Sequence, residues 1–117
     1  MTQMCETQVR HQPEITTIDL HGEINAFAED ALNEAYTQAE SYDPGTIALN
    51  FSDVSYINST GIALIVELLA QARKSHKRLV VYGLSEHYVE IFQITRLADF
   101  MDIFEDETSA KAVELSS

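Results

Sequence analysis

Ser59 and Thr60 are adjacent hydroxyl-bearing residues that stand directly before Gly61 and a long apolar segment. Because apolar residues at helical spacing begin at Ile62, one of the two hydroxyls is expected to cap the N-terminus of a helix. The other hydroxyl is then spare, beside the positive end of the helix dipole and a glycine that lets a phosphate or another chain approach the backbone. This combination predicts a phosphorylation site, although capping alone is the simpler interpretation of the spacing.

A phosphate on one of these hydroxyls would switch an interface. It would add about −1.5 to −2 units of charge, and its oxygens could accept hydrogen bonds from the free N–H groups of the first helical turn. The fold could therefore tolerate the modification. A docked partner would instead meet a bulky anion, and a loss of about 2.7 kcal/mol already weakens binding about a hundredfold.

The elements that position these residues follow from periodicity and turn signals. Strands are predicted at residues 15–21, 46–51 and 79–83. Helices are predicted from residue 26 to a turn at 43–45, over residues 62–72, and over residues 86–94 with Ser85 as a cap. A turn at residues 22–25, a short strand near 101–104 and a short helix after Asp106 complete the chain.

The alternation of strands and helices indicates an α/β fold. A strand, a helix and a strand in succession force parallel pairing through a right-handed crossover, so we expect a mixed, mostly parallel sheet with helices on one or both faces. In such sheets functional loops follow the carboxyl ends of strands and lead into helix N-termini. Residues 52–61 are predicted to form such a loop around Ser59.

Composition and charge indicate one domain that does not bind nucleic acid. The 117 residues suit a single core, and 19 acidic against 7 basic residues give a net charge of −12, which repels nucleic acid and anionic membrane surfaces. Residues 1–14 contain no apolar segment of signal-peptide length, and no segment approaches the length of a membrane span. We expect a cytoplasmic protein without direct membrane insertion. Asn58-Ser59-Thr60 is then not a glycosylation site, because such acceptors matter only in secreted chains.

The sequence does not favour catalysis, a metal or a cofactor. His11, His21, His76 and His87 are scattered without ligand spacing, so no metal site is predicted. Ser59 lacks the Gly-x-Ser-x-Gly setting of a serine hydrolase, and no glycine-rich phosphate loop is present. We therefore expect neither an enzyme nor a cofactor.

Two segments together resemble a known family. DVSYINSTGI, residues 53–62, is similar to the signature of the STAS domains of bacterial anti-sigma factor antagonists, in which an Asp-Ser-Ser/Thr-Gly element precedes an apolar helix. LHGEIN, residues 20–25, is similar to the family's Leu-x-Gly-Glu-Leu-Asp-like turn, and the order of elements matches from residue 8 to residue 107. The resemblance implies a single STAS domain over residues 1–117, with an ordered core of about 8–107. It also implies a STAS-like fold, a mixed and mostly parallel sheet of 4–5 strands with about 4 helices.

This resemblance implies a partner switch that acts by binding. The unphosphorylated protein would bind an anti-sigma factor or related serine kinase of the GHKL type and release that kinase's client. Phosphorylation of Ser59, which occupies the family's acceptor position, would end the complex, and a PP2C-type phosphatase would reset it. Thr60 would act as the cap. The implied partner-binding surface covers residues 58–66 and 22–25, and its named members are Gly22, Glu23, Asn25, Asn58, Thr60, Gly61, Ile62, Ile65 and Val66.

Asn25 and Asn58 depart from the family pattern, in which Asp is common at both positions. Asparagine keeps a carbonyl acceptor, but it cannot take a proton or hold a cation by charge. If the family's carboxylates orient the hydroxyl or the kinase's metal-bound nucleotide, phosphorylation is expected to be slower here. Neutral Asn25 and Asn58 would also repel an attached phosphate less than two aspartates would.

Two alternatives from other functional classes stay open. A non-switching STAS subunit of a membrane transporter would form a persistent complex that is indifferent to the chemistry of Ser59. A STAS module that senses a small ligand would bind an anion or nucleotide at the helix N-terminus, with Ser59 and Gly61 lining the site.

Overall fold

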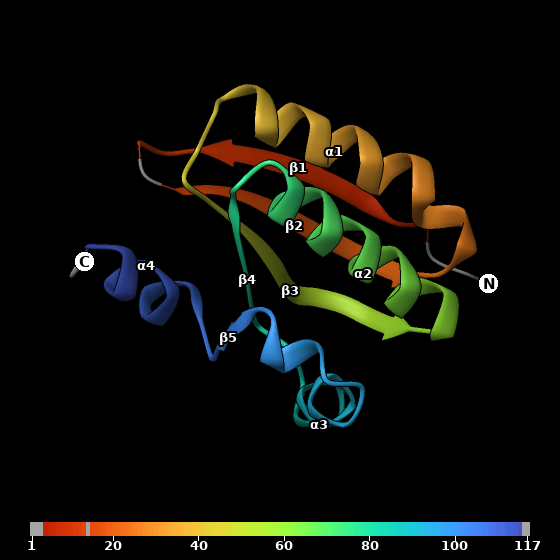
Figure 1. Cartoon of the computed structure of the whole chain (residues 1–117). Coiled ribbons are helices and arrows are strands. Elements are labelled where there is room, and N and C mark those ends of the chain that lie inside the picture. The colour runs from red at the N-terminus through yellow and green to blue at the C-terminus, as the bar shows by residue number, and fades with distance from the viewer. Residues whose placement is uncertain (1–3, 14, 116–117) are drawn as a thin grey trace.

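A five-stranded sheet with helices packed against it forms the fold (Figure 1). The computed structural model describes residues 4–13 and 15–115. The strands are β1 (Glu6–His11), β2 (Ile15–Ile24), β3 (Thr46–Ile57), β4 (Arg78–Tyr82) and β5 (Asp102–Phe104). The helices are α1 (Glu29–Ser41), α2 (Ser59–Lys74), α3 (Glu86–Ile94) and α4 (Glu107–Leu115), with short 3-10 helices η1 (Ala26–Ala28) and η2 (Leu97–Asp99).

The strands lie in the order β1-β2-β3-β4-β5. β1 pairs with β2 in the antiparallel direction, and each later pair is parallel. Helices α1, α2 and α3 make the crossovers between successive parallel strands. The predicted α/β fold with a mixed, mostly parallel sheet is therefore confirmed.

Strand β1 has no counterpart among the predicted elements. It is an edge strand, and its residues alternate between exposed and half-buried positions. Val9 packs against the core from this strand, together with Cys5 just before it. So few apolar residues give no readable alternation, which explains why the strand was missed.

Two hydrophobic cores lie on the two faces of the sheet. Helices α1, α2 and α3 cover the first face, where Tyr36, Ile65 and Phe92 are fully buried. Helix α4 covers the second face, where Ala110 packs in one cluster with Val80. Because successive strand residues point to opposite faces, β4 and the first half of β3 are largely apolar and buried on both sides.

Helices α2 and α3 follow the predicted periodicity. Helix α2 carries Arg73 and Lys74 in its last turn, where cations suit the helix dipole. Helix α3 begins after Ser85, whose hydroxyl oxygen accepts a 3.4 Å hydrogen bond from the amide of Tyr88, so the predicted cap is confirmed. The buried residues of α2 that form its core face are Leu64, Ile65, Leu68, Leu69 and Ala72.

The predicted turn at residues 22–25 is wrong, because β2 continues through it to Ile24. Gly22 adopts a φ of 89°, and the pairing with β3 is irregular between Asp19 and His21 and again between Gly22 and Glu23. A glycine tolerates this left-handed conformation without steric strain, so the strand bends without ending.

The predicted loop at residues 52–61 is also wrong. Strand β3 runs to Ile57 and stays paired with β2 up to that residue, and helix α2 starts at Ser59. Pairing of β3 with β4 ends at Asn50, so the last part of β3 extends beyond its neighbour on that side. Polar residues such as Ser52 and Asp53 are exposed there, and their polarity hid the strand from the sequence pattern.

Candidate functional site

The ends of β2 and β3 meet side by side at one edge of the sheet. Ile24 pairs with Ile57, and the amide of Asn58 donates a 3.2 Å hydrogen bond to the carbonyl oxygen of Ile24. Each strand is followed by an asparagine, Asn25 or Asn58, that begins a helical segment. The two segments that sequence analysis assigned to one surface therefore lie next to each other.

Asn58, and not Ser59 or Thr60, is the N-cap of helix α2. Its backbone is extended (φ −94°, ψ −178°), and its side-chain oxygen Oδ1 accepts a 2.8 Å hydrogen bond from the amide of Gly61. Its carbonyl oxygen accepts the first helical bond, from the amide of Ile62 at 2.9 Å. The predicted capping role of Thr60 is therefore wrong: asparagine is as good a cap as serine, and the helix begins at Ser59, two residues earlier than a Thr60 cap would place it.

Capping by Asn58 leaves both neighbouring hydroxyls outside the cap. Ser59 and Thr60 are the first two residues of α2, and both are exposed. Within residues 4–13 and 15–115, neither side chain makes a hydrogen bond, and their amides have no acceptor. The hydroxyl of Ser59 thus lies beside free N–H groups at the positive end of a 16-residue helix.

Gly61 serves internal packing and does not open the backbone to a ligand. The residue is buried, and a β-carbon built on it would overlap the carbonyl oxygen of Ile24 and lie 2.8 Å from its carbonyl carbon. The same β-carbon would lie 3.0 Å from the Cγ2 atom of Ile57. The expectation that Gly61 admits a phosphate or a partner is therefore wrong, since β2 already fills that space.

The predicted surface residues of α2 divide into exposed and buried positions. Val66 is 43% exposed and Ile62 is half-buried, so both side chains can contribute to a surface. Ile65 is 0% exposed and belongs to the core, which corrects its assignment as a contact residue. Its role is to hold α2 on the sheet.

The neighbouring segment 22–25 presents two half-buried polar side chains, Glu23 and Asn25, while Gly22 is buried in the bend of β2. Asn25 caps η1 through its Oδ1 atom, which accepts a 2.9 Å hydrogen bond from the amide of Phe27. Phe27 is 90% exposed and was missed as a surface residue. An aromatic residue two positions after a capping asparagine, in the first turn of a helical segment, is the signal that could have indicated it.

A groove of about 400 Å³ lies beside Ser59, between the start of α2 and helix α3. Helix α3 was not predicted to belong to the site. The groove is lined from α2 by Ser59 and Ile62 and from α3 by His87, Tyr88 and Ile91. An apolar floor beside an exposed hydroxyl can hold a side chain of a protein partner.

Tyr88 fixes α3 to the strand that leads into the site. Its hydroxyl oxygen accepts a 2.9 Å hydrogen bond from the amide of Ile57, the last residue of β3. Strand β4 does not reach this part of β3, since its pairing ends at Asn50. The hydroxyl of Tyr88 therefore accepts the backbone hydrogen bond of Ile57 that a neighbouring strand would otherwise accept, one residue before Asn58.

A polar cluster lies on the second face of the sheet, the face that α4 covers, and it holds α4 in place. Arg10 donates hydrogen bonds of 2.6 and 2.9 Å to the carboxylate of Asp19 and bonds of 3.1 and 3.2 Å to that of Glu107. Tyr82 donates a 3.2 Å bond to Glu107, and Lys111 forms a 2.7 Å ion pair with the same carboxylate. Helix α4 is thus joined to three strands through one arginine and one glutamate.

This cluster shifts the titration of its members. Hydrogen bonds from Arg10 and then from Lys111 lower the pKa of Glu107 to about 2. Burial acts to raise the pKa of Asp19, but hydrogen bonds from Arg10 and Asn50 outweigh it, and the net shift is downward. Burial and the charge of Glu107 raise the pKa of Tyr82 to about 12. The cluster is charged at neutral pH and stabilises the contact of α4 with the sheet.

Among the residues that the structure describes, no three His, Cys, Asp or Glu side chains gather as a metal site. No helix of this part is long and apolar enough to cross a bilayer.

Sequence comparisons identify relatives along most of the chain. The family model described as STAS domain matches residues 6–110. The anti-sigma-B factor antagonist of Staphylococcus aureus is 30% identical over 94 residues, which cover 80% of this chain and 87% of the relative. That of Listeria monocytogenes is 30% identical over 82 residues, which cover 70% and 72% respectively.

Solved structures share the fold. An anti-sigma factor antagonist from Mycobacterium paratuberculosis superposes with a TM-score of 0.82 at 16% identity, covering 97% of this chain and 98% of that one. SpoIIAA in its unphosphorylated form gives 0.71 at 18% identity, covering 95% and 98%. The phosphorylated form of the Bacillus cell fate determinant SpoIIAA gives 0.69 at 22% identity, covering 92% and 98%. The predicted STAS-like fold is therefore confirmed.

Proposed function

The chain belongs to the anti-sigma factor antagonist family of STAS domain proteins, and on this premise we propose that it is a partner switch controlled by phosphorylation of Ser59. The unphosphorylated protein binds an anti-sigma factor that is also a serine kinase of the GHKL type, and this binding releases the kinase's client. Phosphorylation by the kinase ends the complex, and a PP2C-type phosphatase restores it. In this proposal the protein acts in the cytoplasm by binding and not by catalysis.

The observation that carries the proposal is the position of Ser59. Because Asn58 caps α2, the hydroxyl of Ser59 is exposed and makes no hydrogen bond within the described residues, so a kinase can reach it. A phosphate there would find the free amides of Ser59 and Thr60 and the positive end of the helix dipole. The first turn of α2 can therefore hold the modified side chain without unfolding.

The surface around Ser59 suits a protein partner. Phe27 is 90% exposed on one side, Val66 is 43% exposed along α2, and Tyr56 is 51% exposed at the end of β3. Exposed aromatic side chains are enriched in protein interfaces relative to the rest of a protein surface. A phosphate on Ser59 would place an anion next to them, and a partner that desolvates this surface would be released. That SpoIIAA, which shares the fold, has been solved in phosphorylated and unphosphorylated forms supports a fold that tolerates such a change.

A binding experiment tests the proposal. The protein is titrated against each GHKL-type serine kinase of its host, as wild type and as the Ser59→Asp and Thr37→Asp variants. Thr37 is exposed on α1, so it receives the same charge away from the site. We expect Ser59→Asp to weaken the complex about a hundredfold, which corresponds to about 2.7 kcal/mol, and Thr37→Asp to bind like wild type. If Ser59→Asp binds the kinase as tightly as the wild type does, the result would support the transporter-subunit interpretation instead.

A further inference from the structure

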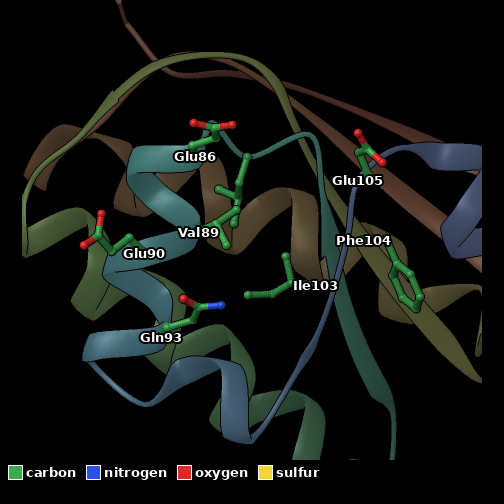
Figure 2. Close-up of a pocket in the computed structure, with 8 residues that line it drawn as sticks. Glu86, Val89, Glu90, Gln93, Ile103, Phe104 and Glu105 are labelled. Atoms are coloured by element: carbon green, nitrogen blue, oxygen red, sulfur yellow. The ribbon is translucent and has the colours of Figure 1, made fainter.

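A groove of about 660 Å³ lies between α3 and β5 (Figure 2). Val89 and Glu90 of α3 line this groove, whereas Tyr88 and Ile91 line the groove beside Ser59. The two grooves thus lie on two faces of one helix. A partner in this second groove would not need to touch Ser59.

The groove follows the free edge of β5. Ile103 packs against the core of the first face of the sheet, and Phe104 packs against the core of the second face. Because a groove lined by both residues contacts both faces, it must run along the edge of the strand. Strand β5 is the last in the sheet order, and an edge strand presents unpaired backbone N–H and C=O groups. An extended chain can therefore pair with it.

The floor of the groove is apolar and its rim is negative. Half-buried Leu84, Val89 and Ile103 form the floor, and half-buried Phe104 lines the groove from the other face of β5. Glu86, Glu90 and Glu105 are exposed at the rim, and in Figure 2 Glu86 of α3 and Glu105 after β5 lie toward the same end.

The rim carboxylates are not neutralised. Within the described residues, Glu86, Glu90 and Glu105 take part in no hydrogen bond or ion pair. The nearest cations in the sequence are engaged elsewhere: Arg78 pairs with Asp102, Arg96 with Asp99, and Lys111 with Glu107. An apolar floor under three uncompensated negative charges is complementary to a segment in which apolar and basic residues alternate.

We infer that this groove docks an extended basic segment of a protein partner, which adds to the sheet as a strand beside β5. Apolar side chains at alternate positions of the segment lie against Val89 and Ile103. Its lysine or arginine side chains meet Glu86, Glu90 and Glu105. A helical segment could fill the groove but could not pair with the strand edge, and nucleic acid would be repelled by the rim.

NMR titration of the isotope-labelled full chain with a short synthetic peptide of alternating lysine and valine tests this inference. We expect shifts confined to the amides of residues 84–93 and 102–105, with slowed hydrogen exchange along β5. The triple variant Glu86→Gln, Glu90→Gln, Glu105→Gln should bind the peptide about tenfold more weakly, as expected for three screened ion pairs. The control triple Glu29→Gln, Asp30→Asn, Glu34→Gln removes the same charge from exposed positions of α1 and should bind like wild type.

Three results would overturn the inference. Equal weakening of peptide binding by the two triple variants would indicate a generic electrostatic association and would exclude a specific groove. Equal affinity for a peptide of alternating lysine and serine would exclude a contribution from the apolar floor. Loss of peptide binding in Ser59→Asp would show that the two grooves are one site. We expect Ser59→Asp to bind the peptide like wild type. A negative result for the proposed switch at Ser59 would therefore not affect this test of the groove.

Discussion

The amide of Asn58 donates a 3.2 Å hydrogen bond to the carbonyl oxygen of Ile24, and the α-carbon of Gly61 packs against the same carbonyl group. The end of β2, the end of β3 and the first turn of α2 therefore meet backbone to backbone. Ser59 lies on the outside of this junction. Its exposure depends on backbone packing and on one asparagine cap, and each of these can be tested.

Substitution of Gly61 by alanine should push α2 away from β2. The added β-carbon overlaps the Ile24 carbonyl group, which is backbone and cannot rotate away. We expect the free energy of unfolding to fall by about 1–3 kcal/mol, as in other overpacked sites, when measured by urea denaturation. Gly45→Ala is the matched control, because no atom lies within 4 Å of a β-carbon there. Equal stability of the two variants would show that the junction is not tightly packed.

Removal of the cap should weaken the start of α2. Asn58→Ala loses the hydrogen bond to the amide of Gly61, and we expect a cost of about 1 kcal/mol in the free energy of unfolding. Asn58→Asp keeps an acceptor at the positive end of the helix and should retain the stability of the wild type or exceed it. Asn33→Ala, at an exposed position within α1, serves as the control. A cost for Asn33→Ala as large as that for Asn58→Ala would contradict the capping role.

Tyr88→Phe should loosen the link between α3 and β3. The variant removes the acceptor of the Ile57 amide, and a lost hydrogen bond of this kind costs about 1 kcal/mol. Hydrogen exchange of the Ile57 amide should become faster by a corresponding factor. Tyr56→Phe removes a hydroxyl from a side chain that is 51% exposed, and it should leave this exchange rate unchanged. If Tyr88→Phe also leaves it unchanged, the tyrosine does not hold the strand.

The cluster under α4 should make stability depend on pH in the acid range. The pKa of Glu107 is about 2 in the folded chain, below its ordinary value of 4.5, so the unfolded chain takes up the proton first. The stabilisation that ionised Glu107 provides is fully present above about pH 4.5 and is lost as the pH falls toward 2. Glu107→Gln should flatten that part of the stability curve and cost on the order of 1 kcal/mol at pH 7.

Urea denaturation between neutral and acid pH measures this effect. Glu34→Gln provides the control, because Glu34 is exposed on α1 and pairs with no cation within the described residues. Its stability curve should run parallel to that of the wild type. A wild-type curve parallel to that of Glu107→Gln would mean that the Arg10 cluster does not hold α4.

Much of the fold could be predicted because its signals are local. The apolar spacing of α3 and its Ser85 cap lie within one short segment, and both were found. The bend at Gly22 and the final residues of β3 could not be recognised, because their strand character comes from pairing between β2 and β3 and not from apolar alternation. Strand β1 was missed for the same reason, since its register depends on β2.

The candidate site was predictable in its position but not in its division of roles. Asparagine and serine are comparable caps, so spacing alone could not choose Asn58 over its neighbours. The contact of Gly61 with Ile24 joins segments far apart in the sequence, and no local pattern reveals it. The same holds for Tyr88, whose place beside Ile57 depends on how α3 packs.

Intact-mass spectrometry after incubation with ATP, magnesium and each GHKL-type serine kinase of the host tests the central claim most directly. Wild type, Ser59→Ala and Thr60→Ala are compared, because both hydroxyls are exposed at the start of α2. The account predicts one added phosphate on the wild type and on Thr60→Ala, and none on Ser59→Ala. A phosphate retained by Ser59→Ala, or a wild type that stays unmodified by a kinase that binds it, would contradict the account.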